Sequence, residues 1–273
     1  KWCYSIGKIS WIHAVITAAA GILIPIFYSK EQYGYMIIVI VFAILDIIFA
    51  YICNEYQKEL FLRRRFTSEL LEEFSSLIKS LSIFVENDSN WKRKIYRTTS
   101  EMVCDKLYNI FKDVFKCETR ISVEYTFQKR LATNKFEKQV RMAGRKSRHR
   151  SQTRKAIPLE RKKKYHSYQI FINNNLGMNI LKADDIKDDS IWYKNPDNNV
   201  DVKRYIGIAV SVLDNKEVNF ILQIDFLDDF KFGKHDTEEE IKNFVDNYLL
   251  SYINVVTLSY LLNLNGKKEL IEV

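Results

Sequence analysis

Two long apolar segments near the start of the chain limit its fold more than any other feature. Ile9–Tyr28 is 20 residues without a formal charge, and Tyr35–Cys53 is 19 residues whose one charge is Asp46. Each is long enough to cross the ~30 Å hydrocarbon core of a bilayer as a helix. Because six residues separate them, we expect a hairpin of two membrane spans. A cleaved signal peptide would explain one segment poorly and two not at all, and two buried core helices are the remaining alternative.

The basic residues around these segments predict an orientation. Two lysines precede the first segment, four Lys and Arg residues within 58–65 follow the second, and the linker carries only Lys30, beside Glu31. The positive-inside rule then places both termini in the cytoplasm. We therefore expect a multi-pass protein of the inner (plasma) membrane, with the lipid bilayer as its first partner.

Asp46 is a candidate gating residue, because a carboxylate inside a span is costly and often functional. His13 lies at a similar depth on the first segment, so a His13–Asp46 contact is expected within or between hairpins. Simple packing against another helix is the alternative role.

After residue 53 the chain becomes polar but keeps a helical pattern. Apolar residues at 70, 74, 77, 81 and 84 follow the spacing of a coiled-coil seam over two heptads. Residues 54–90 are therefore expected to form a helical stalk, either a coiled coil or an amphipathic helix packed on its own domain.

The remainder predicts an α+β domain. Period-two alternation or continuous apolar runs predict five strands in a mainly antiparallel sheet, at 121–127, 136–142, 168–172, 205–213 and 218–226. Helices are expected at 91–115 and from the capping box at Thr237 to about residue 264, with 173–203 as a long loop that has short helical pieces. The expected division is a two-span hairpin over 1–53, a stalk over 54–90, a cytoplasmic domain over 91–264 and a tail over 265–273.

The end of this domain resembles GAF-like sensory domains. The residues that carry the resemblance are the strand hairpin Ile206–Phe226, the following Phe232 and His235-Asp236, and the apolar helix Ile241–Leu262. The resemblance covers roughly residues 91–264. It implies a fold that binds a small ligand or dimerises, and so a homo-oligomer.

Nothing in the sequence indicates an enzyme. Neither a nucleophile-elbow motif nor a phosphate-binding glycine loop occurs. The four cysteines and four histidines lack metal-ligand spacing, so no metal or cofactor is expected. The Asp pairs at 184–185 and 188–189 are interpreted as a solvated loop, and Asp225 as a turn residue.

A basic segment is the strongest sign of a partner. Residues 128–165 hold 15 Lys and Arg residues against two acids, a local charge of +13 that leaves −5 for the rest of the chain. Such a segment suits a phosphorylated small molecule, anionic lipid or, less readily, nucleic acid; a solvated loop is the alternative. The candidate ligand-binding residues are Arg141, Arg145, Lys146, Arg148, Arg150 and Arg154, with Tyr125 from the neighbouring strand.

The sequence therefore predicts a membrane-anchored sensor whose cytoplasmic domain binds an anionic intracellular ligand and signals to the spans. This layout resembles membrane effectors of bacterial nucleotide-signalled antiphage systems, which disrupt the membrane. The alternative is a non-catalytic membrane-tethered scaffold whose basic segment binds anionic lipid, a protein partner or nucleic acid.

Overall fold

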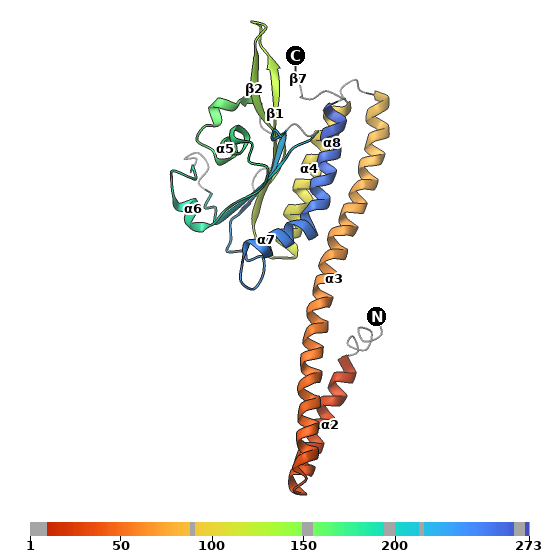
Figure 1. The fold of residues 1–273 in the computed structure, drawn as a ribbon. Coiled ribbons are helices and arrows are strands. Elements are labelled where there is room, and N and C mark those ends of the chain that lie inside the picture. Colours follow the sequence, from red (N-terminus) through yellow and green to blue (C-terminus); the bar gives the residue numbers. More distant parts are fainter. Residues whose placement is uncertain are drawn as a thin grey trace. The chain divides into compact units, whose positions relative to one another are not determined.

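The computed structural model describes residues 10–87, 91–148, 155–193, 200–212, 216–264 and 271–272 (Figure 1). The chain divides into two compact units, Lys1–Thr67 and Ser68–Val273. The two units are described separately below.

The first unit is built from two helices, α2 (Ser10–Ser29) and the first part of α3 (Tyr33–Asn87). The short turn between them includes Glu31 at a φ of 55°. The ring centroids of Phe27 and Tyr35 lie 5.8 Å apart across this turn. Helix α3 continues without a break through the expected start of the stalk, which confirms its helical pattern. Of residues 69–87, which carry the heptad seam, only the side chain of residue 75 is described, so the coiled coil stays a prediction.

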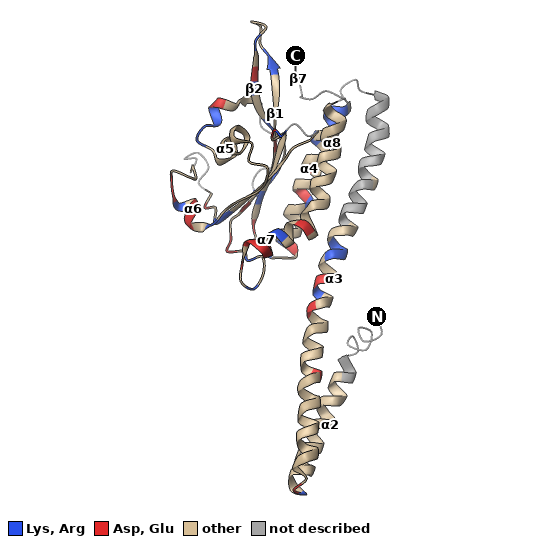
Figure 2. Cartoon of the chain, in the orientation of Figure 1, with Lys and Arg blue, Asp and Glu red and all other residues tan. Residues whose placement is uncertain are grey.

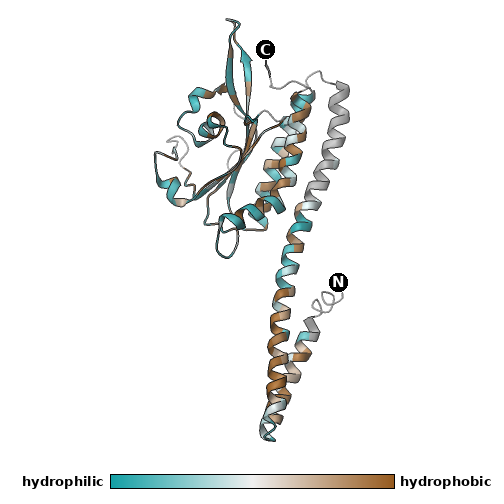
Figure 3. Ribbon diagram, in the orientation of Figure 1, coloured by the Kyte–Doolittle hydropathy of each residue, from teal (hydrophilic) through white to brown (hydrophobic). Residues whose placement is uncertain are grey.

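One helix in the described chain is long and apolar enough to cross a membrane. It covers Tyr33–Ser68, with a mean hydropathy of 2.9 in an 18-residue window of which 6% is buried. Its apolar side chains are mostly exposed, as Phe42 is at 66%. The apolar part of the helix is brown in Figure 3. The apolar part of α2 with described side chains, His13–Ser29, is shorter. The membrane span expected at Ile9–Tyr28 and the orientation of the chain stay predictions.

The second unit confirms the α+β class. The strands of its sheet follow the order β3-β2-β1-β6-β5-β4, and all neighbours along this path are antiparallel. A short seventh strand pairs in parallel with β1. The strands are β1 (Thr119–Arg130), β2 (Phe136–Lys146), β3 (Ile157–Pro158), β4 (Gly177–Leu181), β5 (Arg204–Val210), β6 (Phe220–Phe226) and β7 (Ile271–Glu272).

Helices cover both faces of this sheet. On one face, α4 packs on β1 and β2 and against α8; Figure 1 shows α5 and α6 on the other side. The capping box at Thr237 is confirmed, because its Oγ1 accepts a hydrogen bond from the Glu240 amide at 3.2 Å. The helices are α4 (Trp91–Asp113), the 3-10 turn η1 (Leu159–Lys162), α5 (His166–Asn173), α6 (Ala183–Lys187), α7 (Glu238–Phe244), the π-helical turn η2 (Val245–Leu249) and α8 (Leu250–Leu264).

The predicted strand at 168–172 is wrong, because these residues belong to helix α5. Alternation over five residues cannot exclude a helix, and here the adjacent Ile170 and Phe171 are both buried on the core side. The helix ends at Asn174 in the left-handed conformation, with a φ of 51°. The region expected to be a long loop with short helical pieces contains the short helix α6 as expected, but it also contains strand β4, so the five-strand count is incomplete.

A β-bulge in β2 changes which side chains share a face of the sheet. Val123 pairs with Gly144, whereas the next residue of β1, Glu124, pairs with Met142. Ala143 is therefore the extra residue, and the in-out alternation of β2 is inverted across it. Gly144 faces α4, where an added Cβ would collide with the backbone of Ser100.

Candidate functional site

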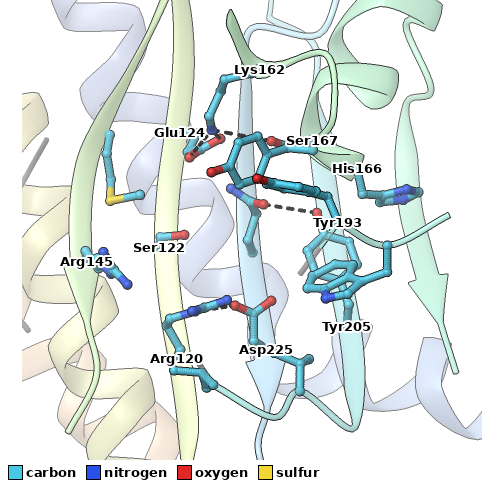
Figure 4. Close-up of a pocket in the computed structure, with 16 residues that line it drawn as sticks. Arg120, Ser122, Glu124, Arg145, Lys162, His166, Ser167, Tyr193, Tyr205 and Asp225 are labelled. Carbon is cyan, nitrogen blue, oxygen red and sulfur yellow. Dashed lines mark hydrogen bonds and ion pairs between the residues drawn. The ribbon is translucent and has the colours of Figure 1, made fainter. Parts of the chain in front are cut away.

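A pocket opens on the sheet face opposite α4, over the middle of β2, β1, β6 and β5 (Figure 4). Side chains from η1, α5 and the segment before β5 close over it. Its space is about 840 Å³ with open solvent included.

The first ion pair of the pocket joins Lys162 to Glu124. The Lys162 Nζ lies 2.5 Å from both Glu124 carboxylate oxygens and 3.5 Å from the Ser167 Oγ. Glu124 and Lys162 are 5% and 8% exposed. Burial opposes ionisation of Glu124, but the ammonium of Lys162 outweighs it and holds the pKa of this carboxyl below its ordinary value. The pair thus fixes η1 onto the sheet.

A second ion pair lies at the other end of the pocket. The Arg120 Nε donates to the Asp225 Oδ2 at 2.5 Å. Asp225 lies within strand β6, so the expectation that it is a turn residue is wrong. Burial raises the pKa of Asp225, while Arg120 and Arg145 act in the opposite direction. Arg145 is 6% exposed and lies beside Ser122, its cross-strand partner, between the two ion pairs (Figure 4).

Aromatic rings form the other wall of the pocket. The Trp192 ring lies 5.3 Å from that of Tyr205, and the rings of Tyr165 and Tyr193 are 5.2 Å apart at 81°. His166 also lines the pocket, and burial lowers its pKa. The wall offers flat apolar surfaces opposite three cationic groups, which can hold a planar ring and an anionic group together.

The predicted ligand-binding residues do not share one site. Arg145 faces the pocket, whereas Arg141 lies beyond the bulge on the face toward α4. There the Arg141 Nη1 donates to the Tyr125 hydroxyl at 3.2 Å. Tyr125 is 3% exposed and packs edge-on against Tyr96 at 5.1 Å. Strict alternation would have kept residues 141 and 145 on one face, and the extra Ala143 separates them.

Lys146 and Arg148 do not line the pocket. Lys146 forms an ion pair with Asp105 on α4 and lies 5.9 Å from the Tyr108 ring centroid. Arg148 is exposed. Arg150 and Arg154 lie outside the described residues.

Several pocket residues were missed from the sequence. Arg120, Ser122 and Glu124 are the polar alternates of β1, so the strand pattern already marked a polar face. Lys162 lies within the basic segment but resembles its neighbours there. Trp192 is one of the few apolar residues in the region that was expected to be a long loop. Only the tertiary fold brings these residues together.

Within the part of the chain that the structure describes, no group of three or more His, Cys, Asp or Glu side chains is arranged to hold a metal ion. Cys104 and Cys117 are buried thiols, and burial raises the pKa of Cys117 to about 12. Neither thiol is activated as a nucleophile.

No protein-family model matches the chain, and no curated protein matches it. Among solved structures, the chain is similar to the A. aeolicus nlh2 GAF domain in an inactive state, at 12% identity and a TM-score of 0.37, over 72% of this chain and 98% of that one. It is also similar to a type II free methionine-R-sulfoxide reductase from Thermoplasma acidophilum, at 13% identity and a TM-score of 0.39, over 66% of this chain and 99% of that one. At these values the likeness carries no argument about the site.

Proposed function

We propose that the α+β unit is a ligand-binding sensor whose ligand combines a planar ring with an anionic group. The observation that carries this proposal is the pocket itself, with Arg145 between two buried ion pairs and a facing wall of aromatic rings. A nucleotide has both chemical parts. The role proposed here is binding, not catalysis.

The charges of the pocket support an anionic ligand of modest charge. Three cations, Arg120, Arg145 and Lys162, face two carboxyl groups, Glu124 and Asp225. The excess is one positive charge, and it lies in a site where burial strengthens electrostatic interactions. A singly charged phosphate group, either a diester or the monoanion of a monoester, matches this excess better than a polyanion does.

Fluorescence of Trp192 tests the proposal, because its ring lines the pocket. We expect a nucleoside monophosphate such as AMP or GMP to change the emission of the full-length chain in lipid nanodiscs. A Trp192→Phe variant should lose that change and keep the binding. Trp91→Phe is the matched control, since residue 91 starts α4 on the other side of the sheet. A ligand-induced change that persists in Trp192→Phe would contradict the assignment.

We further propose that both apolar segments span the inner membrane with both termini in the cytoplasm, and that ligand binding changes the oligomeric state of the spans and raises permeability. Supporting observations are the exposed apolar surface of α3 and the hydrogen bond from His13 Nδ1 to Asp46 Oδ1 at 2.8 Å, with both side chains mostly buried. A role in antiphage defence rests on the resemblance of layout alone. Dye release from liposomes that contain the full chain tests the permeability step.

A further inference from the structure

A second pocket lies on the sheet face toward α4, separate from the ligand pocket. It is formed by the start of α4, by β1 and β2, and by residues 155–156, and its space is about 960 Å³ with open solvent included. Met142, at the bulge, lines both pockets.

Five of the ten residues that line this second pocket are cationic, and none of the ten is acidic. Arg93 and Arg97 come from one face of α4, four residues apart, and meet the three others across the sheet edge; Lys and Arg on these elements are blue in Figure 2. The three others are Lys129, Arg141 and Lys155. The Arg97 Nε donates to the Glu101 carboxylate on the same helix at 3.0 Å.

Arg141 is held in place at the inner end of this pocket. Its guanidinium donates to the Tyr125 hydroxyl and lies 4.7 Å from the Phe127 ring centroid. A guanidinium fixed by an aromatic face and a hydroxyl loses little freedom on binding an oxyanion. The pocket therefore has an oriented fork at its base and the exposed cations Lys129 and Lys155 at its rim.

Helix α4 places these cations where they oppose its own dipole. Its first turn contains Lys92, Arg93 and Lys94 and no acidic residue. Positive side chains at a helix N-terminus are unfavourable, whereas an anion there is favoured. A bound oxyanion would neutralise both the helix terminus and the mutual repulsion of the five cations.

We infer that this second pocket is a binding site for a phosphoryl group that carries two or more negative charges. The strong charge excess distinguishes it from the ligand pocket, where carboxyl groups offset most of the cations. The phosphoryl group could belong to a soluble phosphate compound or to a phospholipid headgroup, and both would engage the same cations.

The test uses inorganic pyrophosphate and the full chain in phosphatidylcholine nanodiscs, by isothermal titration. The variant Lys129→Gln/Lys155→Gln removes two exposed rim cations. It should raise the dissociation constant for pyrophosphate about tenfold or more. The matched control is Arg130→Gln/Lys135→Gln, which removes two charges from exposed residues of the same hairpin that do not line the pocket. The control should bind as the wild type does.

Arg145→Gln separates the two pockets and should leave pyrophosphate binding unchanged. Equal weakening by the rim variant and its control, a loss of binding in Arg145→Gln alone, or no binding to the wild type would overturn the inference. Nanodiscs that contain phosphatidic acid identify the source: competition with pyrophosphate assigns the site to a lipid headgroup, and unchanged affinity assigns it to a soluble phosphate. The sensor proposal can fail without affecting these outcomes.

Discussion

At the scale of single residues, the Glu124–Lys162 ion pair is the clearest departure from an ordinary core. Both groups are almost fully buried, and they face each other as an ion pair. A buried pair adds little net stability over apolar residues, but removal of one partner leaves an uncompensated charge. The pair is therefore expected to position η1 more than to stabilise the fold.

Lys162→Met should destabilise the α+β unit by about 3–5 kcal/mol, because it leaves the Glu124 carboxylate buried and unpaired. The double variant Glu124→Gln/Lys162→Met should recover most of that loss. Chemical denaturation followed by circular dichroism measures both. A double variant no more stable than the single one would show that the charge is not the cause.

Glu124 and Asp225 should respond to pH with opposite signs. The pKa of Glu124 is lowered in the folded state, so its contribution to stability is present above its ordinary value of 4.5 and is lost as pH falls through the folded pKa. The pKa of Asp225 is raised from its ordinary value of 3.8, so the folded state binds this proton more tightly and gains stability as pH falls through the folded pKa.

Denaturation of Glu124→Gln and Asp225→Asn between pH 7 and pH 3 checks these signs. The stability deficit of Glu124→Gln against the wild type should shrink at low pH, and that of Asp225→Asn should grow. Parallel curves for the two variants would contradict the electrostatic description of the pocket.

At the scale of elements, the sequence predicted what short-range periodicity encodes. Strand β1 and the capping box at Thr237 follow from residues that are neighbours in the chain. The bulge at Ala143 has no such signal, since it depends on how β2 pairs with β1. The predicted ligand-binding site is wrong for the same reason, because the sequence pattern assigned Arg141 and Arg145 to one site and the bulge puts them on opposite faces of the sheet. Helix α5 was predicted as a strand because a run as short as residues 168–172 fits the period of a strand and that of a helix equally well.

Gly144→Ala tests the packing of α4 on the bulged strand. The added methyl group would meet the backbone of Ser100, which cannot rotate away as a side chain can. Overpacking of this kind typically costs about 1–3 kcal/mol. Gly21→Ala is the control, because nothing lies within 4 Å of its added Cβ. Only Gly144→Ala should lower the midpoint temperature of thermal unfolding. An unchanged midpoint would contradict the close packing of α4 on β2.

At the scale of the whole molecule, one continuous helix belongs to both compact units. Helix α3 starts in the first unit, Lys1–Thr67, and continues into the second unit, which holds the ligand pocket. The lining of the pocket is not encoded in any local pattern, because its residues come from separate strands and loops that meet only after folding.

Asp46→Asn should reduce ligand-dependent dye release from liposomes, because it removes the charge that accepts from His13 within the apolar unit. Ile47→Val is the control, because Ile47 is the next residue along the helix and its side chain is 62% exposed. Equal release by both variants would show that the His13–Asp46 contact only supports packing.

The most direct test of the ligand pocket compares two arginines of the basic segment that differ only in where the fold places them. Arg145 is buried in the pocket and Arg148 is exposed, and each changes to Gln with the same loss of charge. Titration of the full chain with nucleoside monophosphates should show an affinity about tenfold or more weaker for Arg145→Gln. Arg148→Gln should match the wild type. Equal affinities for both variants, or no binding by the wild type, would contradict the ligand-binding role of the pocket.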